Sequence, residues 1–237
     1  MNQSNKQYLE FLVHSGVEYF LQNKENNYYT QNKKADLRDT IVQNNDLNKI
    51  NNVENLKKEL DSLNHPLKKN TNKTVIFDGN LSADLMIIGE APGREEDLKG
   101  LPFMGMAGQL LNKMLSAINL KREEVYITNV VPWRPPNNRT PTNEEILEFL
   151  PYLQKQIEII KPKLIFLLGG TAAKAILSTS ESLGKLRGKW YEYKSINLNS
   201  STYVLVSYHP AFLLRSPNYK KEAWVDLQML QKKLNEI

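Results

Sequence analysis

Three polar residues able to take part in catalysis each follow a short apolar segment. Glu90 comes directly after the apolar residues 85–88, Asn129 ends the segment 125–129, and His209 follows the apolar residues 204–206 with a rigid Pro210 behind it. In open α/β sheets the carboxyl ends of buried strands meet at one edge, and ligands bind there. A carboxylate in such a place can position or deprotonate water, and a carboxamide offers both a donor and an acceptor. The spacing therefore predicts one concave site that holds these groups.

The residues after the first apolar segment predict a pocket. Residues 89–111 read GEAPGREEDLKGLPFMGMAGQLL, with four closely spaced glycines after the first and a single Phe at position 103. Pro92 fixes its own φ and Gly93 permits a positive φ, so the backbone there can turn sharply and present N–H groups to a ligand. The Phe103 ring offers a flat face on which a planar base can stack. These residues leave the ligand itself unidentified.

The apolar periodicity predicts an α/β fold. We expect a three-layer α/β/α sandwich with a central, mainly parallel, four-stranded sheet, because apolar strands alternate with amphipathic helices from residue 74 onward. Thr142 and Glu145 have the spacing of a capping box and mark a helix start. The predicted strands are residues 84–89, 125–130, 163–168 and 203–207, and the predicted helices are residues 106–118, 142–160, 171–178 and 220–235.

The first 70 residues differ in character from the rest. They are rich in Asn and Lys, and apolar stripes predict helices at residues 6–22 and 46–63. We therefore expect a helical extension of unknown function over residues 1–70 and a catalytic domain over residues 71–237. The formal net charge of +5 favours a polyanionic partner, and no apolar run approaches the roughly 20 residues that span a bilayer. A cytoplasmic monomer that has no membrane partner is the expectation.

Several separated motifs carry a family resemblance. They are GEAPGREED at residues 89–97, GLPFMGMAGQLL at residues 100–111, ITNVVPWRPPNNRTPTNEE at residues 127–145 and YHPAFLLR at residues 208–215. In this order and spacing they resemble the family 4 uracil-DNA glycosylases of the uracil glycosylase superfamily, from about Ser62 to the C-terminus. The resemblance implies base excision repair of uracil-containing DNA, single- or double-stranded. The reaction hydrolyses the N-glycosidic bond, releases free uracil and leaves an abasic site.

The resemblance implies roles for two catalytic residues. Glu90 would position or deprotonate the water that attacks the sugar C1′, and His209 would donate a hydrogen bond to uracil O2 as negative charge develops there. Ala91 stands where other branches of the superfamily place Asp or Asn, so the carboxylate chemistry moves to Glu90. Whether His209 is neutral or cationic is left open by the sequence.

Three further residues are expected to bind the base. Phe103 would stack on it, and the Asn129 amide would match O4 and N3–H of uracil, a pair that cytosine presents in the opposite sense. An amide can flip, so this discrimination calls for a contact that fixes its orientation. Glu96 corresponds to a family residue near uracil C5, where bulk would exclude the methyl group of thymine.

The expected DNA contacts come from two segments. Phe212, Leu213 and Leu214 form an apolar wedge that could fill the gap left by a flipped base, with Arg215 behind it to meet phosphate. A buried helix start is the other interpretation of these leucines. Two arginines flank the Pro-rich segment after the second strand and are expected to contact phosphate as well, namely Arg134 and Arg139.

The chain contains no cysteine. The resembled family commonly ligates a [4Fe–4S] cluster through four Cys thiolates. Its cysteine positions fall on Ser62, His65, Trp133 and Phe149, none of which supplies a thiolate. We therefore expect no iron–sulfur cluster and no metal or other cofactor, and hypothesise that packing of the large rings replaces ligation.

Three other functions would fit an α/β chain of this kind. A non-catalytic DNA-binding or replication-associated module on the same fold is the main alternative, although the joint retention of Glu90, Phe103, Asn129 and His209 argues against it. A related branch forms a covalent adduct through a His in an inserted loop, but residues 133–141 contain no His. A nucleotide-binding protein of different chemistry is disfavoured because the chain lacks a Walker lysine motif and a GxGxxG fingerprint.

Overall fold

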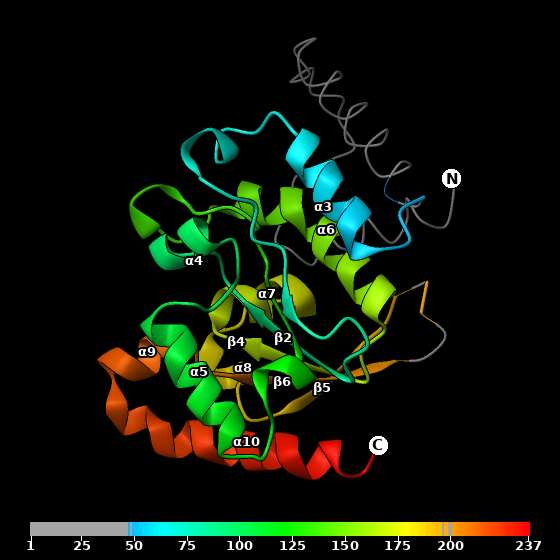
Figure 1. Ribbon diagram of the computed structural model, residues 1–237. Coiled ribbons are helices and arrows are strands. Elements are labelled where there is room, and N and C mark those ends of the chain that lie inside the picture. Colours follow the sequence, from blue (N-terminus) through cyan, green and yellow to red (C-terminus); the bar gives the residue numbers. More distant parts are fainter. Residues whose placement is uncertain (1–46, 48, 196, 199–200) are drawn as a thin grey trace, which may run out of the picture.

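A computed structural model of the protein describes residues 47, 49–195, 197–198 and 201–237 (Figure 1). Its centre is a six-stranded sheet with the order β1-β3-β2-β4-β6-β5. The four central strands are parallel, namely β3 (Tyr126–Asn129), β2 (Leu85–Gly89), β4 (Leu164–Leu168) and β6 (Thr202–Ser207). These are the four predicted strands, each within one residue of its expected ends.

Two antiparallel edge strands complete the sheet. The two-residue β1 (Asp78–Gly79) pairs with β3, and β5 (Trp190–Tyr193) pairs with β6. Neither was among the predicted strands, because β1 is too short to show a period and β5 is only partly buried. The α/β class and the mainly parallel sheet are confirmed, and the predicted count of four strands is extended by two.

Helices cover both faces of the sheet. In Figure 1, α3 (Val53–Ser62) and α6 (Asn143–Ile160) lie on one side, and α5 (Met106–Ser116) and α10 (Lys220–Leu234) lie on the other. The two buried clusters follow this division, because alternate strand residues such as Met86 and Ile87 face opposite helices. The shorter helices are α4 (Arg94–Lys99), α7 (Gly170–Leu177), α8 (Leu183–Leu186) and α9 (Pro210–Arg215), with 3₁₀ turns η2 (Lys68–Asn70), η3 (Arg122–Glu124), η4 (Pro136–Asn138) and η5 (Pro217–Tyr219).

Local sequence signals explain where two helices begin. Thr142 accepts a hydrogen bond from the Glu145 amide and Glu145 accepts one from the Thr142 amide, so the predicted capping box starts α6. The helix predicted at residues 46–63 is observed as α3, which begins at Val53 because the Asn52 side chain caps it through the Asn55 amide. The predicted helix at residues 6–22 lies outside the described residues.

The packing of α3 bears on the predicted division of the chain. Val53, Leu56 and Leu60 are buried in the same core as α6 and the sheet. The described residues before position 70 therefore share a core with the residues that follow. Among the residues that the structure describes, no helix combines the length and apolar character needed to cross a membrane.

Candidate functional site

A cavity of about 190 Å³ opens where the parallel strands end. Its walls come from the loop after β2, the turn after β3, the 3₁₀ turn η4 and the start of α9. Seven of the residues predicted from sequence line it, namely Glu90, Ala91, Glu96, Phe103, Asn129, Arg139 and His209. The other four predicted residues are not among its lining, namely Arg134, Leu213, Leu214 and Arg215.

Gly89 allows two of these side chains to meet. It pairs with Asn129 in the parallel register of β2 and β3, so the Asn129 side chain stands beside it. A Cβ added to Gly89 would lie 2.5 Å from Asn129 Oδ1 and 2.5 Å from the Phe103 ring. Real Cβ atoms do not approach other atoms so closely, so any side chain here would push the amide and the ring apart. Because Gly89 has no side chain, the Asn129 amide and the Phe103 ring can lie next to each other at the end of β2.

Phe103 is held in an unusual backbone conformation. Its φ of 52° lies in the left-handed region, which costs free energy for a residue with a side chain. The guanidinium of Arg122 donates hydrogen bonds to the backbone carbonyls of Pro102 and Phe103 and is itself paired with Asp78 at 2.6 Å. The Phe103 ring is 5 % exposed and stacks against His209 at 5.4 Å between centroids. Arg122 thus stabilises the turn that aims this ring into the cavity.

Asn129 is the last residue of β3, and the residue is 5 % exposed. Within the described part of the chain, no group hydrogen-bonds its carboxamide. The amide atoms are not among the enclosed unpaired side-chain atoms of the described residues, so they face the open cavity that Asn129 lines. Both its donor and its acceptor therefore remain available to a ligand in the cavity, and the fixing contact expected from sequence is not found among these residues.

Glu90 is oriented by a hydroxyl from a distant element. The Thr171 Oγ1 atom, in the first turn of α7, donates a hydrogen bond of 2.5 Å to Glu90 Oε2. The other carboxylate oxygen, Oε1, has no such partner among the described residues. No sequence pattern singles out the Thr171 hydroxyl, so Thr171 is a residue of the site that sequence reasoning missed. No local signal connects it to Glu90, which lies 81 positions away.

His209 is held in one tautomer. Its Nδ1 accepts a hydrogen bond of 3.1 Å from the Ala211 amide, which makes His209 the N-cap of α9. In a neutral imidazole the proton must then sit on Nε2, which becomes a donor. Burial and, to a smaller extent, the charge of Arg215 lower the pKa of His209 to about 4, while Glu96 opposes the shift. At neutral pH the site therefore contains an uncharged N–H donor.

Glu96 organises the backbone around the pocket. Its carboxylate accepts hydrogen bonds from the amides of Gly93, Met104 and Gly105 at 2.7 to 3.0 Å. These contacts join the start of α4 to the turn that follows Phe103. The carboxylate is therefore occupied by the protein backbone, although the residue still lines the cavity.

Arg139 and Arg134 lie at the Pro-rich segment as expected, but both have protein partners. Arg139 forms a bidentate ion pair with Glu145 at 2.5 and 2.7 Å, which lowers the pKa of Glu145. Arg134 donates a hydrogen bond to Asn138. Any phosphate contact by these arginines would have to share or displace these partners.

The residues of the predicted wedge differ in exposure, because they lie on different faces of α9. Leu213 is 1 % exposed and belongs to the core beneath α10, whereas Leu214 is 37 % exposed and Arg215 lies at the surface. One turn of helix places successive residues on different faces, so only part of a short apolar run can face outward. The expectation that Leu213 contacts DNA is corrected, and the buried helix interpretation holds for this residue.

The four positions that the resemblance matched to cluster cysteines are occupied by side chains with other partners. They are Ser62, His65, Trp133 and Phe149. Trp133 and Phe149 are fully buried and pack edge to face at 5.1 Å, while His65 stacks on Trp133 at 5.5 Å. Both His65 nitrogens are used, since Nδ1 accepts from the Leu67 amide and Nε2 lies 3.0 Å from Glu148. Ser62 is exposed and donates to the Glu59 carbonyl. This donor set does not fit a [4Fe–4S] cluster, because the Trp133 indole N–H is already a hydrogen-bond donor, the Phe149 ring has no donor atom, and none of the four is a thiolate.

No group of three or more His, Asp or Glu side chains is arranged to hold a metal ion in the described ranges. The rings of His65, Trp133 and Phe149, hereafter the aromatic cluster, fill the region instead. Trp133 Nε1 donates to Thr74 Oγ1, and Thr74 Oγ1 donates to Asp61 at 2.5 Å. The aromatic cluster therefore ties α3, the β3 turn and α6 together by packing and hydrogen bonds.

A parallel sheet with an aromatic ring, an amide, a carboxylate and a neutral imidazole around one cavity at its carboxyl edge has the form of a base-binding hydrolase site. The model of the Uracil DNA glycosylase superfamily matches residues 76–228, which include all of the pocket elements. The chain belongs to this superfamily.

Three individual relatives show which branch of the superfamily this chain is similar to. The chain is similar to the type-4 uracil-DNA glycosylase of Pyrobaculum aerophilum, with 44 % identity over 69 % of this chain and 85 % of the relative. It is also similar to that of Archaeoglobus fulgidus, with 44 % identity over 67 % and 79 % of the two chains. A third relative is the type-4 enzyme of Saccharolobus solfataricus, with 42 % identity over 67 % and 74 %.

Proposed function

We propose that this protein is a DNA repair glycosylase that hydrolyses the N-glycosidic bond of uracil in DNA. It releases free uracil and leaves an abasic site in uracil-containing DNA, single- or double-stranded. The observation that carries the proposal is the convergence of Glu90, Phe103, Asn129 and His209 on one cavity in a chain of this superfamily. A base must leave the stack to enter so small a cavity, which is the general strategy of enzymes that act on bases.

Recognition of uracil is assigned to Phe103 and Asn129. The ring stacks on the base, while the Asn129 amide donates to O4 and accepts from N3–H. Support comes from the position of this amide, which lines the cavity and has no hydrogen-bond partner among the described residues, so it can pair with the base. Ala91 lines the pocket without a polar group, and Glu96 keeps its expected place beside C5 as a proposal, acting through the loop that it holds.

Stabilisation of the leaving base is assigned to His209. As the C1′–N1 bond breaks, the electron pair moves to uracil and negative charge grows on O2. An Nε2–H donor that is already oriented by the Ala211 amide needs no reorganisation to meet that charge. Because the ring is neutral, it stabilises the anion as a hydrogen-bond donor without becoming a strong acid.

Activation of water is assigned to Glu90. Thr171 occupies Oε2, which leaves Oε1 to accept a proton from water as the water oxygen bonds to C1′. The carboxylate also lies near the positive charge that develops on the sugar. Thr171 acts here as a positioning residue, because it touches Glu90 and not the substrate.

The remaining assignments concern the partner and setting of the enzyme. Leu214 and Arg215 are proposed to meet DNA at the surface of α9, and Arg134 and Arg139 to contact phosphate beside the cavity. The proposed reaction uses neither an iron–sulfur cluster nor a metal. A cytoplasmic monomer, with a helical extension over residues 1–70 and a catalytic domain over residues 71–237, stays a prediction.

The direct test is release of uracil from a labelled oligonucleotide by the purified full chain. We expect release from single-stranded and U:G substrates in the presence of a chelator, with an Asn129→Ala variant slower by about 10²- to 10³-fold and little changed in DNA affinity. A protein that binds DNA but releases no uracil from either substrate would favour the alternative, a non-catalytic DNA-binding module. A fully active Asn129→Ala variant would show that the base pocket is misassigned.

A further inference from the structure

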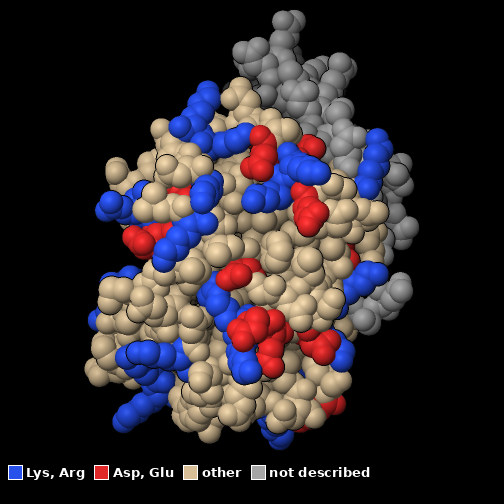
Figure 2. All heavy atoms as spheres, in the orientation of Figure 1, with Lys and Arg blue, Asp and Glu red and all other residues tan. Residues whose placement is uncertain are grey.

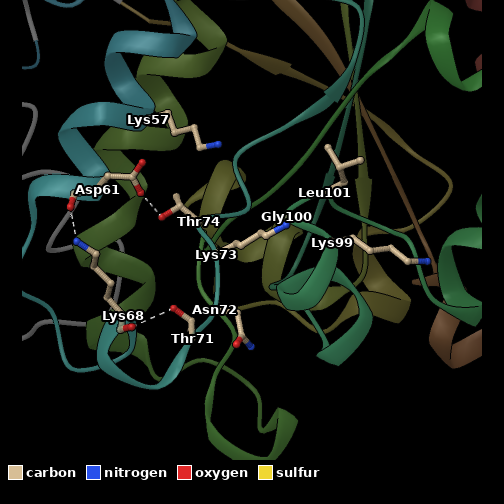
Figure 3. A pocket seen from close by; sticks show the side chains of 10 residues that line it. All are labelled: Lys57, Asp61, Lys68, Thr71, Asn72, Lys73, Thr74, Lys99, Gly100 and Leu101. Atoms are coloured by element: carbon tan, nitrogen blue, oxygen red, sulfur yellow. Dashed lines mark hydrogen bonds between the residues drawn. The ribbon is translucent and has the colours of Figure 1, made fainter.

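A second cavity, of about 670 Å³, lies next to the end of α4, whereas the catalytic pocket lies next to its start. It is lined by α3, the segment 68–74 and the turn that ends α4 (Figure 3). Its most frequent residue is lysine, and we call it the lysine groove after Lys57, Lys68, Lys73 and Lys99. In Figure 3 the side chains of Lys57 and Lys73 point into the space between α3 and the Gly100–Leu101 turn, whereas Lys99 extends away along its outer side.

The charges in the lysine groove are poorly neutralised. Lys57, Lys73 and Lys99 form no ion pair with any residue in the described part of the chain. Lys68 caps the end of α3 through the backbone carbonyls of Asp61 and Leu63. Other lysines are paired with carboxylates, among them Lys155, Lys163, Lys194 and Lys233.

One carboxylate lines the lysine groove, and it is already engaged. Asp61 accepts a hydrogen bond from Thr74 Oγ1, which in turn accepts one from Trp133 of the aromatic cluster. Four lysines and one carboxylate leave a formal charge of +3 in the groove. Figure 2 shows Lys and Arg side chains over α3, the segment after it and α4 on the same face, with some Asp and Glu side chains among them. An anionic occupant is therefore favoured.

The position of Lys73 is fixed by the fold. Asp97 of α4 is 1 % exposed and accepts hydrogen bonds from the Asn72 amide at 2.7 Å, the Asn72 side chain at 2.6 Å and the Lys73 amide at 3.3 Å. Gly100, with a φ of 77°, leaves room for the Lys73 side chain, whose Cδ would lie 2.9 Å from a Cβ at that position. A buried carboxylate and a left-handed glycine thus hold this lysine over the turn that ends α4.

The lysine groove and the catalytic pocket share a short segment of chain. Glu96 and Phe103 line the pocket, while Lys99, Gly100 and Leu101 line the groove. Only one residue separates Leu101 from Phe103, so their Cα atoms are at most about 7 Å apart. A polyanion with one unit in the pocket would have its neighbouring units within reach of the groove.

We propose that the lysine groove binds backbone phosphates of the DNA strand on one side of the extruded nucleotide. This inference rests on the proposed function for its choice of polyanion. Lysines are flexible point charges that follow a phosphate backbone without reading its sequence, and the groove offers no buried, unpartnered polar group that would select a small ligand. The groove thus adds affinity and fixes the strand's path, while the pocket selects the base.

The first experiment measures binding of a fluorescein-labelled single-stranded oligonucleotide by anisotropy at several salt concentrations. The test variant is Lys57→Gln/Lys73→Gln/Lys99→Gln. Its matched control is Lys113→Gln/Lys121→Gln/Lys232→Gln, which removes the same charge from exposed positions outside both cavities. We expect the test variant to raise Kd about tenfold near 0.1 M salt and to lower the slope of log K against log salt by about 2, since each lost phosphate contact removes about 0.7. Equal behaviour of the two triple variants would overturn the inference.

The second experiment asks where along the DNA the contact is made. Oligonucleotides with one central uracil are lengthened by three nucleotides on the 5′ side or on the 3′ side. The wild-type protein and the control variant should gain affinity from one of these extensions, and the test variant should lose that gain. If each extension helps all three proteins equally, the groove does not hold a flanking strand.

These measurements distinguish a failure of the lysine-groove inference from a failure of the proposed function. Uracil release by the wild-type protein reports on the function alone. Binding that depends on the lysine groove without any uracil release would retain the phosphate site and reject the glycosylase assignment. Uracil release with binding indifferent to the groove would reject the inference alone. Thermal unfolding by circular dichroism checks that both triple variants are folded.

Discussion

The catalytic pocket and the aromatic cluster treat their polar groups in opposite ways. In the pocket, Asn129 is buried without a partner among the described residues, and the Nε2 of His209 is left as a donor. In the aromatic cluster, the Trp133 indole donates to Thr74 and both His65 nitrogens are occupied. The rings of the cluster also fill the space around one another at 4.9 to 5.5 Å between centroids.

This contrast separates a site kept for a ligand from a site closed by packing. The polar groups of the pocket face an open cavity, so they remain available to a ligand that pairs with them on binding. Fully paired rings instead stabilise the fold, with aromatic pairs contributing roughly 0.5 to 1.5 kcal/mol each beyond their burial. The region where the family resemblance placed cluster ligands is here a junction of three elements, joined by rings and hydrogen bonds. Changes in the two regions should therefore affect different properties.

The largest expected effect is on stability, from Trp133→Ala. Removing a fully buried ring and its hydrogen bond to Thr74 should lower the free energy of unfolding by about 3 to 5 kcal/mol. Urea unfolding followed by circular dichroism measures this, with Trp133→Phe as the control that keeps a ring and loses less. At low temperature the folded variant should still release uracil within a few-fold of wild type. A stable but inactive Trp133→Ala protein would show that the cluster belongs to the active site.

The opposite behaviour is expected of His209→Asn. An Asn side chain can still cap α9, but it is too short to bring a donor to the place of Nε2. The single-turnover rate of uracil release should fall by about 10²- to 10³-fold, the usual effect of losing a donor to developing charge. The unfolding midpoint should change little. A rate within threefold of wild type would exclude His209 from the reaction.

A smaller loss is expected from Thr171→Val, which keeps the shape of the side chain and removes its hydroxyl. Hydrogen bonds to charged groups contribute about 1.5 kcal/mol or more, so the single-turnover rate should fall roughly tenfold. DNA affinity should not change, because the Thr171 hydroxyl hydrogen-bonds to Glu90 and Thr171 is not among the residues that line the cavity. Thr171→Ser should restore most of the rate. Failure of serine to rescue would indicate that the methyl group, and not the hydroxyl, matters at this position.

The smallest effect concerns pH. The pKa of His209 is lowered to about 4 by burial, so its NMR signals should not titrate near 6.5. The chain has three histidines, and a spectrum of His209→Asn assigns the signal. Between pH 6.5 and 4 the unfolded chain binds more protons here than the folded one, so this residue makes stability fall as pH falls through that window. Titration of His209 at its ordinary pKa would remove the neutral donor from the mechanism.

The sequence predicted the central elements because their signals are local. Each parallel strand contains a short apolar segment, and α6 begins at a capping box made by residues three positions apart. The strand ends also predicted that Glu90, Asn129 and His209 would share one edge of the sheet. The two-residue β1 and the half-buried β5 carry no comparable pattern, so they were not predicted.

Parts of the candidate site could not be predicted because they depend on how the elements dock. Thr171 reaches Glu90 across 81 positions, and Arg122 holds the Phe103 turn from 19 positions away. Leu213 and Leu214 are adjacent and equally apolar, yet one is buried and the other is exposed, because α9 packs against α5 and the core on one face only. Both are leucines in the same short apolar run, so the sequence alone does not show which one is buried.

The sequence by itself determined the α/β class, the order of the parallel strands along the chain and the set of polar residues at their carboxyl ends. Short-range patterns suffice for these, since backbone conformation and burial act over a few residues. Only the tertiary structure decided that Thr171 orients Glu90 and that Phe103 stacks on His209. It also decided that rings pack at the positions matched to the family's cysteines, and that lysines of three segments line one groove. Each of these depends on side chains brought together by the packing of helices on a sheet, which no local spacing specifies.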